Sequence, residues 1–270
     1  MSLPTPAPDR TAVVTGASSG IGAAIARELA GRGHGVTLVA RRAEKLTALA
    51  DELGALGVRA EVLPADLSKR SDRAELLGRV EALGLVPDML VNNAGVSTLG
   101  PVASADPEAE MNMIEVDVVS VADLCTRFLP GMTARRRGVV LNVASTAAFQ
   151  PLPGQAGYGA SKAFVLSYSQ SLAGELHGSG VTVTALCPGP VQTEFGEAAG
   201  FADGDAEAAL PSIMWVPAED VAKTAVDAMA KGQMVAIPGI ANRVGSVFAS
   251  LTPRSLLVPI LARVHPGLKK

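Results

Sequence analysis

Short apolar runs alternate along the chain with longer segments that mix Ala, Leu, Glu and Arg. The apolar runs are continuous, with no regular polar interruptions, as expected of parallel strands that are covered on both faces. Each run is followed by a segment of helical composition, which is typical of a doubly wound α/β domain. We expect strands at 11–16, 35–40, 58–65, 88–95, 138–145, 181–189 and 233–239, and helices at 20–32, 43–55, 71–83, 107–136, 157–178 and 217–231.

This order predicts a Rossmann-like, doubly wound parallel sheet of about seven strands, with helices on both faces. We expect a leader at 1–10, one domain over 11–240, and an apolar, basic helical extension of that domain over 241–270. The segment 189–216 is too long and irregular for a simple connection, and it therefore predicts a substrate lid.

Composition agrees with one globular domain and limits the classes of partner and ligand that we expect. Hydrophobic residues make up 48% of the 270 residues and charged residues 18%, which allows a sizeable core. The net charge of −3 gives no excess of cations for nucleic-acid binding. Neither the two cysteines nor the three histidines have metal-site spacing, so we expect no metal. The first residues lack the apolar core of a signal peptide, and no run is long enough to span a bilayer, so we expect a cytoplasmic protein.

Three glycines, Gly16, Gly20 and Gly22, lie between the first strand and the first helix. Glycines at this point allow a tight turn and a close approach of the backbone to a pyrophosphate at the helix N-terminus. Residues 16–20 also fit G-x-S-x-G, the nucleophile elbow of serine hydrolases. That elbow belongs in the middle of a sheet, followed by an acid and a histidine, whereas the histidines downstream of this loop lie in no motif. We therefore favour dinucleotide binding.

The end of the second strand indicates which dinucleotide is bound. An NAD-dependent enzyme usually has Asp or Glu there, but this chain has Ala40, followed by Arg41 and Arg42. Guanidinium groups suit the extra 2′-phosphate of NADP(H), which makes NAD the less favoured cofactor. The alternative is two solvated arginines at a helix start.

Tyr158 and Lys162 are set four residues apart in YGASK, which places them on one face of a helix. A cation beside a phenol of intrinsic pKa roughly 10 favours the phenolate, as a proton-transferring tyrosine requires. Alone, the pair also fits a rim tyrosine beside a solvated lysine. The other tyrosine, Tyr168, has Leu172 at the corresponding position.

Several separated motifs together carry a family resemblance. With TGASSGIG at 15–22, NNAG at 92–95, a serine at 145, YGASK at 158–162 and PGPVQT at 188–193, the chain resembles the short-chain dehydrogenase/reductase family. The resemblance covers nearly all of 11–240 and is strongest to single-domain NADP-dependent reductases labelled as ketoacyl reductases.

The resemblance implies a catalytic role for three residues. Tyr158 would donate the proton, Ser145 would hold the substrate oxygen, and Lys162 would lower the pKa of Tyr158 and bond the nicotinamide ribose. Tyr158 and Lys162 would thus also contact the cofactor, together with Gly16, Ser18, Ser19, Gly20, Ile21, Gly22, Arg41, Arg42, Asp66, Leu67, Asn93, Ala94, Gly95, Pro188, Gly189, Val191 and Thr193.

Asp117 departs from the family pattern, which has an asparagine at this place in the helix. The backbone carbonyl of that asparagine holds a water beside the lysine, a role that a change of side chain leaves intact. The carboxylate of Asp117 could pair with Lys162 and weaken its effect on Tyr158. We therefore expect retained activity with an altered pH profile.

The expected lid is rich in large apolar residues that would enclose an apolar substrate, although such a loop could also pack its apolar residues on its own domain. They are Phe195, Phe201, Leu210, Ile213, Met214 and Trp215.

Three features suggest partners. Arg135, Arg136 and Arg137 form either a solvated cap of the long helix or a dock for an acidic acyl-carrier protein. The helices at 107–136 and 157–178 form the dimer or tetramer surface in the resembled family. The tail 241–270 would extend a subunit interface, cover the substrate pocket, or attach peripherally to a membrane.

The sequence as a whole favours an NADP(H)-dependent oxidoreductase that interconverts a carbonyl and a secondary alcohol, with an apolar ketone or 3-oxoacyl compound as substrate. The alternative is a nucleotide-binding regulator without turnover. Retention of both Tyr158 and Lys162 favours the enzyme.

Overall fold

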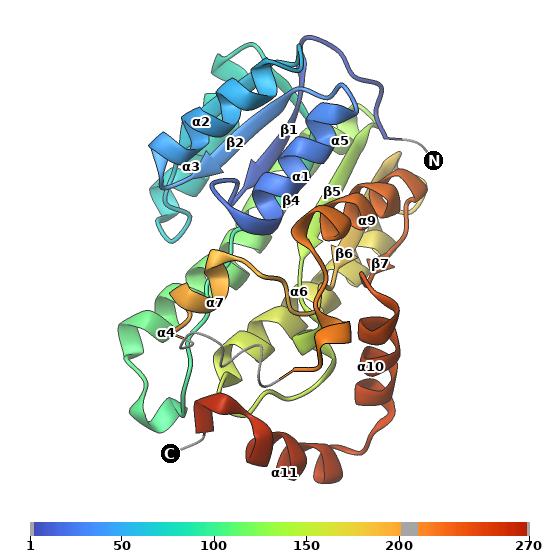
Figure 1. The fold of residues 1–270 in the computed structure, drawn as a ribbon. Coiled ribbons are helices and arrows are strands. Elements are labelled where there is room, and N and C mark those ends of the chain that lie inside the picture. The colour runs from blue at the N-terminus through green and yellow to red at the C-terminus, as the bar shows by residue number, and fades with distance from the viewer. Residues whose placement is uncertain (1–2, 201–209, 269–270) are drawn as a thin grey trace.

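The computed structural model describes residues 3–200 and 210–268 and contains one seven-stranded sheet. The strand order is β3-β2-β1-β4-β5-β6-β7, and every neighbouring pair is parallel (Figure 1). The order reverses at β1, where a doubly wound sheet opens a crevice for a ligand. The strands are β1 (Arg10–Thr15), β2 (Val36–Ala40), β3 (Ala60–Pro64), β4 (Val86–Asn92), β5 (Gly138–Val143), β6 (Val181–Leu186) and β7 (Val235–Ala236).

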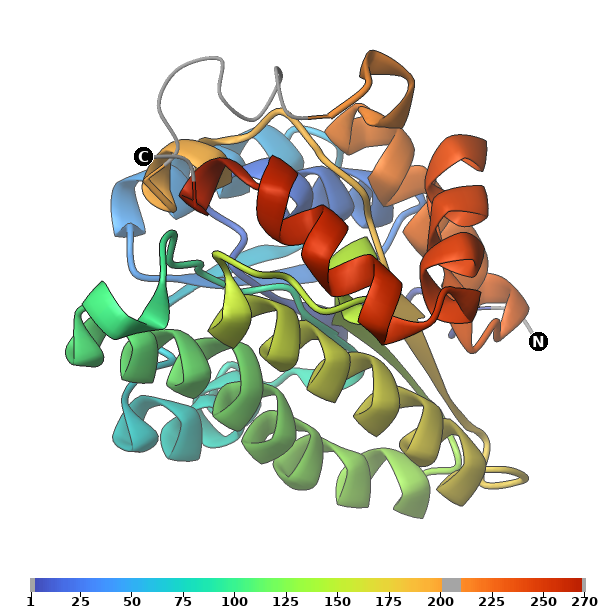
Figure 2. The same ribbon diagram turned by 90° about the horizontal axis from the view of Figure 1, so that it is seen from below.

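Helices cover both faces of the sheet, as its continuous apolar strands require. On one face lie α1 (Gly20–Gly31), α2 (Ala43–Gly54) and α9 (Ala218–Lys231), and on the other lie α3 (Arg70–Ala82), α5 (Ser120–Ala134) and α6 (Ala156–Glu175) (Figure 2). Successive strand residues point to opposite faces: Ala12 and Val14 join one core, and Val13 joins the other. The predicted fold class is thus confirmed.

The segment expected to be one helix over 107–136 differs from the prediction. It consists of α4 (Pro107–Ile114), a π-helical turn over Glu115–Val119, and α5. Glu115 contacts Arg73 of α3, and Asp117 contacts Lys162 of α6. A π turn accommodates an extra residue within a helix, and such turns are frequent at functional sites. The apolar periodicity of the sequence does not reveal it.

The segment expected to be a lid and the tail contain helices beyond the sheet. The described part of 189–216 holds α7 (Glu194–Ala198) and the 3₁₀ turn Ser212–Met214. The tail forms α10 (Ile240–Leu251), α11 (Arg254–Val264) and the 3₁₀ turn Pro266–Leu268. Two further 3₁₀ turns lie at Val102–Ser104 and Thr146–Phe149. Of the helices in the described residues, none is both long and apolar enough to cross a membrane.

Candidate active site

The glycine loop between β1 and α1 is packed against the end of β4. Gly16 and Gly20 have φ angles of 65° and 54°, a conformation that favours glycine. A Cβ at Gly22 would lie 2.4 Å from the Asn93 Nδ2 atom. The three glycines therefore let the loop close tightly over the strand ends. Ser19, at the N-cap of α1, makes no side-chain hydrogen bond to the helix. The first amide groups of α1 thus have no side-chain cap, and such groups are suited to bind a pyrophosphate.

Asn93 joins the ends of β1 and β4. Its Nδ2 atom donates to the Thr15 carbonyl oxygen at 2.9 Å, and its backbone N–H donates to Thr15 Oγ1, also at 2.9 Å. The Ala94 N–H donates to the same hydroxyl at 3.0 Å. Thr15, the first residue of TGASSGIG, is therefore a positioning residue, and the sequence does not reveal this role because its partners follow a strand far away in sequence.

Arg42 lies beside the glycine loop. Its guanidinium donates to the hydroxyls of Ser18 (2.9 Å) and Ser19 (2.8 Å). It also pairs with Glu194 of α7 at 2.7 Å, and Lys45 pairs with the second oxygen of that carboxylate at 2.5 Å. These contacts hold the pKa of Glu194 at about 2, well below its usual range. An exposed cluster of cations and hydroxyls, already holding one carboxylate, has the right donors for a phosphate. Arg41 is exposed next to it.

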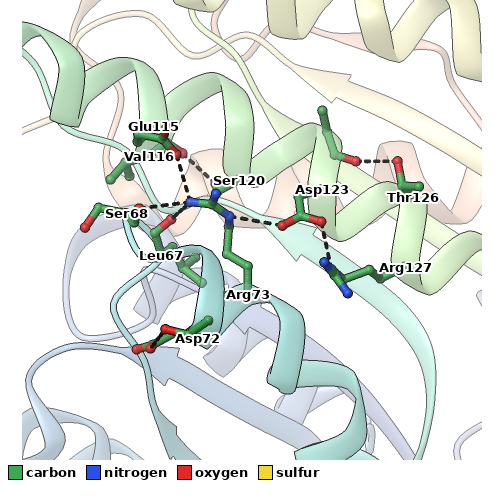
Figure 3. A network of polar contacts seen from close by, with 12 residues as sticks. Leu67, Ser68, Asp72, Arg73, Glu115, Val116, Ser120, Asp123, Thr126 and Arg127 are labelled. Carbon is green, nitrogen blue, oxygen red and sulfur yellow. Dashed lines mark hydrogen bonds and ion pairs between the residues drawn. The ribbon is translucent and has the colours of Figure 1, made fainter.

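Asp66 and Leu67, two of the expected cofactor contacts, follow β3. The Asp66 carboxylate accepts from the Ser68 hydroxyl at 2.8 Å, and Leu67 is buried. The Leu67 carbonyl oxygen accepts from Arg73 at 2.7 Å. The buried Arg73 guanidinium also contacts Glu115 at 3.0 Å and Asp123 at 3.1 Å (Figure 3). Arg73 therefore joins the loop after β3 to the π-helical turn.

The π-helical turn presents Asp117 to the interior. This side chain is fully buried, and its Oδ1 atom accepts from the Val96 N–H at 2.8 Å. Its Oδ2 atom lies 2.9 Å from Lys162 Nζ. A Cβ at Gly95 would lie 3.2 Å from Lys162 Nζ and 3.3 Å from Asp117 Oδ2, so the glycine of NNAG leaves the space that this pair occupies.

Lys162 connects Asp117 to Tyr158. Its ammonium donates to the Val143 carbonyl oxygen at 3.3 Å and lies 5.6 Å from the centre of the Tyr158 ring. Burial lowers the pKa of Lys162, but the attraction of Asp117 and Tyr158 outweighs burial and raises the pKa overall. The lysine is therefore an ammonium whose charge is shared between two partners.

Tyr158 lies on α6, one turn before Lys162. Burial raises its pKa, Lys162 lowers it, Asp117 raises it again, and the nearby Ser145 hydroxyl lowers it, with a net increase. The ring packs against Phe195 of α7, with the ring centres 5.8 Å apart. Ser145 follows β5 as the N-cap of the turn Thr146–Phe149, and its Oγ atom accepts from the Ala147 N–H at 3.1 Å. The structure thus brings Asp117, Lys162 and Tyr158 together, with Ser145 beside them.

The segment 188–193 continues from β6 toward the glycine loop. The Pro188 carbonyl oxygen accepts from the Thr146 N–H at 2.9 Å. A Cβ at Gly20 would lie 3.1 Å from the Thr193 methyl group, so the two motifs are neighbours. A Cβ at Gly189 would clash with Asn242 of α10, and Val191 packs on the core. Ile21, the remaining expected cofactor contact, is partly buried at the start of α1.

The expected lid residues divide into two groups. Phe195 contacts Tyr158, whereas the Met214 carbonyl oxygen accepts from Asn242 at 2.9 Å, which directs that segment toward α10. Trp215 is half-buried in the same segment. Phe201 lies outside the described residues.

The three consecutive arginines after α5 bind groups of this same chain. Arg135 donates to the Pro87 carbonyl oxygen at 3.1 Å, and Arg136 donates to that of Gly178 at 2.9 Å. Arg137 pairs with the buried Asp88 carboxylate at 2.8 Å. These contacts favour a structural role over a free cationic dock.

The sequence motifs do not reveal Glu194, Lys45 and Arg73 as parts of the site. An acid next to Thr193 carries no local signal, and Lys45 resembles any surface lysine of a helix. Arg73 acts only through the partners that the fold gathers around it. Within the described residues, no group of three or more His, Cys, Asp or Glu side chains could hold a metal ion.

Comparisons with known proteins agree with this geometry. A sequence profile of the short chain dehydrogenases matches residues 10–201. A short chain dehydrogenase of Pseudocercospora fijiensis is 40% identical over 206 residues, which make up 72% of this chain and 66% of that protein. An NADP-dependent 3-hydroxy acid dehydrogenase of Salmonella typhi is 41% identical over 187 residues, 68% of this chain and 73% of that protein.

A solved structure gives the same result over a longer stretch. The short-chain dehydrogenase from Sphingobium yanoikuyae in complex with NADPH has a TM-score of 0.79 and 33% identity, over 93% of this chain and 95% of that one. The chain therefore belongs to the short chain dehydrogenase family of oxidoreductases.

Proposed function

We propose that the protein is an NADP(H)-dependent oxidoreductase that interconverts a carbonyl group and a secondary alcohol. The observation that carries this proposal is the convergence of three groups: the Lys162 ammonium lies 2.9 Å from Asp117 and 5.6 Å from the ring centre of Tyr158. An ionisable phenol beside a buried ammonium is suited to transfer a proton.

The cofactor proposal rests on the hydrogen-bond donors gathered at the carboxyl ends of the strands. Arg42 with the Ser18 and Ser19 hydroxyls offers charge-assisted hydrogen bonds to a 2′-phosphate, and the N-terminus of α1 suits the pyrophosphate. The Salmonella relative is NADP-dependent, and the Sphingobium structure contains NADPH. When bound, NADP(H) supplies or accepts the hydride.

In the reductive direction, Tyr158 would donate its hydroxyl proton to the carbonyl oxygen. Ser145 would hold that oxygen by a hydrogen bond, and Lys162 would stabilise the resulting phenolate. In the oxidative direction, the phenolate would take the proton of the alcohol. Asp117 would draw part of the Lys162 charge away, so that the phenolate forms at a higher pH than it would beside an unpaired lysine.

The proposed substrate class is an apolar ketone or a 3-oxoacyl compound. Phe195 contacts the Tyr158 ring and offers an apolar surface next to the reacting group. The Salmonella relative acts on 3-hydroxy acids, which are the alcohol counterparts of 3-oxo acids.

The test is NADPH oxidation measured on a panel of ketones, quinones and 3-oxoacyl thioesters. We expect turnover of at least one apolar carbonyl, and a loss of about 10²- to 10⁴-fold in Tyr158→Phe. Tyr168→Phe is the matched control because it removes the other tyrosine hydroxyl. A Tyr158→Phe enzyme at full speed would refute the mechanism, and NADPH binding without turnover across the panel would favour the regulator.

We also propose a homodimer or homotetramer that forms through α5 and α6. On the exposed surface of α6, Phe164 stacks on Tyr168 with ring centres 5.4 Å apart, an apolar feature that suits helix packing between subunits. Light scattering of the parent and of Phe164→Ser tests this, and a parent that scatters as a monomer would contradict it.

A further inference from the structure

Helix α10 has its polar side inward and its apolar side outward. The residues buried against the domain are Asn242, Ser246 and Ala249. The exposed residues recur every three or four positions and therefore form one face. This face, which we call the α10 stripe, consists of Ile240, Val244, Val247, Phe248 and Leu251.

The α10 stripe is strongly exposed and continues onto the next helix. Ile240 is 81% exposed, Phe248 68% and Leu251 77%. On α11, Leu256, Val258 and Ile260 are also exposed. Figures 1 and 2 show both helices at the periphery of the molecule, with α11 running across the end opposite to β2 and α2. An outward apolar surface of this kind indicates a binding partner.

The inward side of α10 explains why the helix is oriented this way. Asn242 Nδ2 donates to the carbonyl oxygens of Met214 (2.9 Å) and Pro238 (3.1 Å). Turning the apolar face inward would take the Asn242 amide away from those two carbonyl oxygens, at a cost in free energy. The exposure of the α10 stripe is therefore built into the fold.

The charge of the tail indicates which kind of partner the α10 stripe contacts. The protein as a whole is acidic, yet after Asp227 the sequence contains no Asp or Glu, while it contains Lys231, Arg243, Arg254, Arg263, Lys269 and Lys270. A second copy of the chain would place this cationic tail against its own equivalent, and like charges would repel. The α10 stripe has no hydrogen-bonding side chain, whereas protein interfaces carry regular hydrogen bonds. A surface that is apolar inside and anionic at its boundary fits both properties.

We propose that the tail docks α10 and α11 onto the surface of a bilayer that contains anionic phospholipids. The α10 stripe enters the boundary between headgroups and acyl chains, and the cations of the tail contact the phosphate and carboxylate groups. The tail lies beside the turn Thr146–Phe149 that follows Ser145, because Arg254 donates to the Phe149 carbonyl oxygen at 3.1 Å. If the proposed function holds, docking therefore brings the proposed active site close to the bilayer, which is a source of apolar substrates.

Flotation of the full-length protein with vesicles tests the proposal. The parent is expected to float with vesicles of phosphatidylcholine and phosphatidylserine, and to float at least about tenfold less with phosphatidylcholine alone or at high salt. Phe248→Ser combined with Leu251→Ser removes apolar contact, and Arg243→Gln combined with Arg263→Gln removes charge. Each pair is expected to reduce the bound fraction about tenfold or more.

Matched controls lie in the N-terminal half of the chain, away from the tail in sequence. Leu56→Ser changes an apolar residue that is also more than half exposed, and Arg70→Gln changes an exposed arginine; both should float like the parent. Circular dichroism and vesicle-free NADPH binding of each tail variant, equal to the parent, show that the fold and the cofactor site are intact. Flotation and NADPH binding need no substrate, so this test stays informative even if the protein turns over no carbonyl compound.

Three outcomes would overturn the proposal. The parent does not float with anionic vesicles; the tail variants float as well as the parent; or Phe248→Ser with Leu251→Ser converts an oligomeric parent to monomers, which shows that a second copy covers the stripe.

Discussion

Two ion pairs lie beside the proposed cofactor site, and they have similar N–O distances but very different exposure to water. Lys162 and Asp117 are 2.9 Å apart, with side chains 5% and 0% exposed. Arg42 and Glu194 are 2.7 Å apart, with side chains 45% and 47% exposed. The comparison shows that the same contact distance can correspond to two different physical roles.

The buried pair is permanent because water cannot replace either partner. Removing one partner leaves a charge alone in the protein interior, which costs about 3–5 kcal/mol. The exposed pair is exchangeable, because such a contact contributes only about 0–1 kcal/mol. An anion that offers better geometry can therefore displace Glu194 from Arg42. We accordingly propose that the first pair tunes Tyr158, the proposed proton donor, and that the second is a reversible contact between α7 and α2.

The largest expected effect is the loss of the buried cation. Lys162→Met leaves Asp117 unpaired, and we expect the free energy of unfolding to fall by about 3–5 kcal/mol together with a loss of activity. The double variant Lys162→Met with Asp117→Asn should regain part of the stability and none of the activity. Urea unfolding and NADPH oxidation measure both quantities. A Lys162→Met variant that unfolds at the same urea concentration as the parent would show that the buried pair does not constrain the folded state.

Asp117→Asn should alter the pH dependence while the lysine stays in place. Asp117 raises the pKa of Tyr158, so its removal lowers that pKa. Alcohol oxidation requires the phenolate, and its rate rises as the pH rises through the Tyr158 pKa. The rising limb of the pH–rate curve should therefore move to lower pH in the variant. Asp51→Asn, an exposed carboxylate on α2, is the control; an unmoved curve in Asp117→Asn would dismiss the tuning role.

Arg42→Ala should weaken NADPH binding by roughly 10- to 100-fold and leave NADH binding unchanged, because it removes charge-assisted hydrogen bonds to the 2′-phosphate. Arg41→Ala should have a smaller effect, since Arg42 is the arginine that contacts the Ser18 and Ser19 hydroxyls. Fluorescence titration with both cofactors measures this. Equal NADPH affinity of both variants and the parent would argue for NAD, or for a phosphate site elsewhere.

The smallest expected effect is that of Glu194→Gln. Lys45 and Arg42 hold the pKa of Glu194 at about 2, so the carboxylate is charged at any working pH and would compete with a 2′-phosphate for these cations. Its removal should tighten NADPH binding by up to about fivefold at low salt, with no change for NADH. Glu52→Gln breaks the similarly exposed Arg27 pair and serves as the control. Weaker NADPH binding in Glu194→Gln would mean that the carboxylate supports the site.

The sequence was sufficient where a function depends on neighbours along one element. Tyr158 and Lys162 share a helix face because of their spacing, and the glycine loop follows a recognisable strand. It was insufficient where partners come from different elements. The 2.9 Å contact of Asp117 with Lys162 was only one possibility, and Arg73 gave no local signal for its contacts with Leu67, Glu115 and Asp123.

By itself, the sequence determined the parallel sheet and the order of its motifs, since continuous apolar runs can be buried only when helices cover both faces. The tertiary structure alone decided which charges meet and which are buried. It turned Asp117 inward through a π-helical turn, set Glu194 against Arg42, and turned the apolar side of α10 outward. The physical reason is that charge pairing and burial depend on distances between elements, and hydrophobic periodicity along one element contains no information about them.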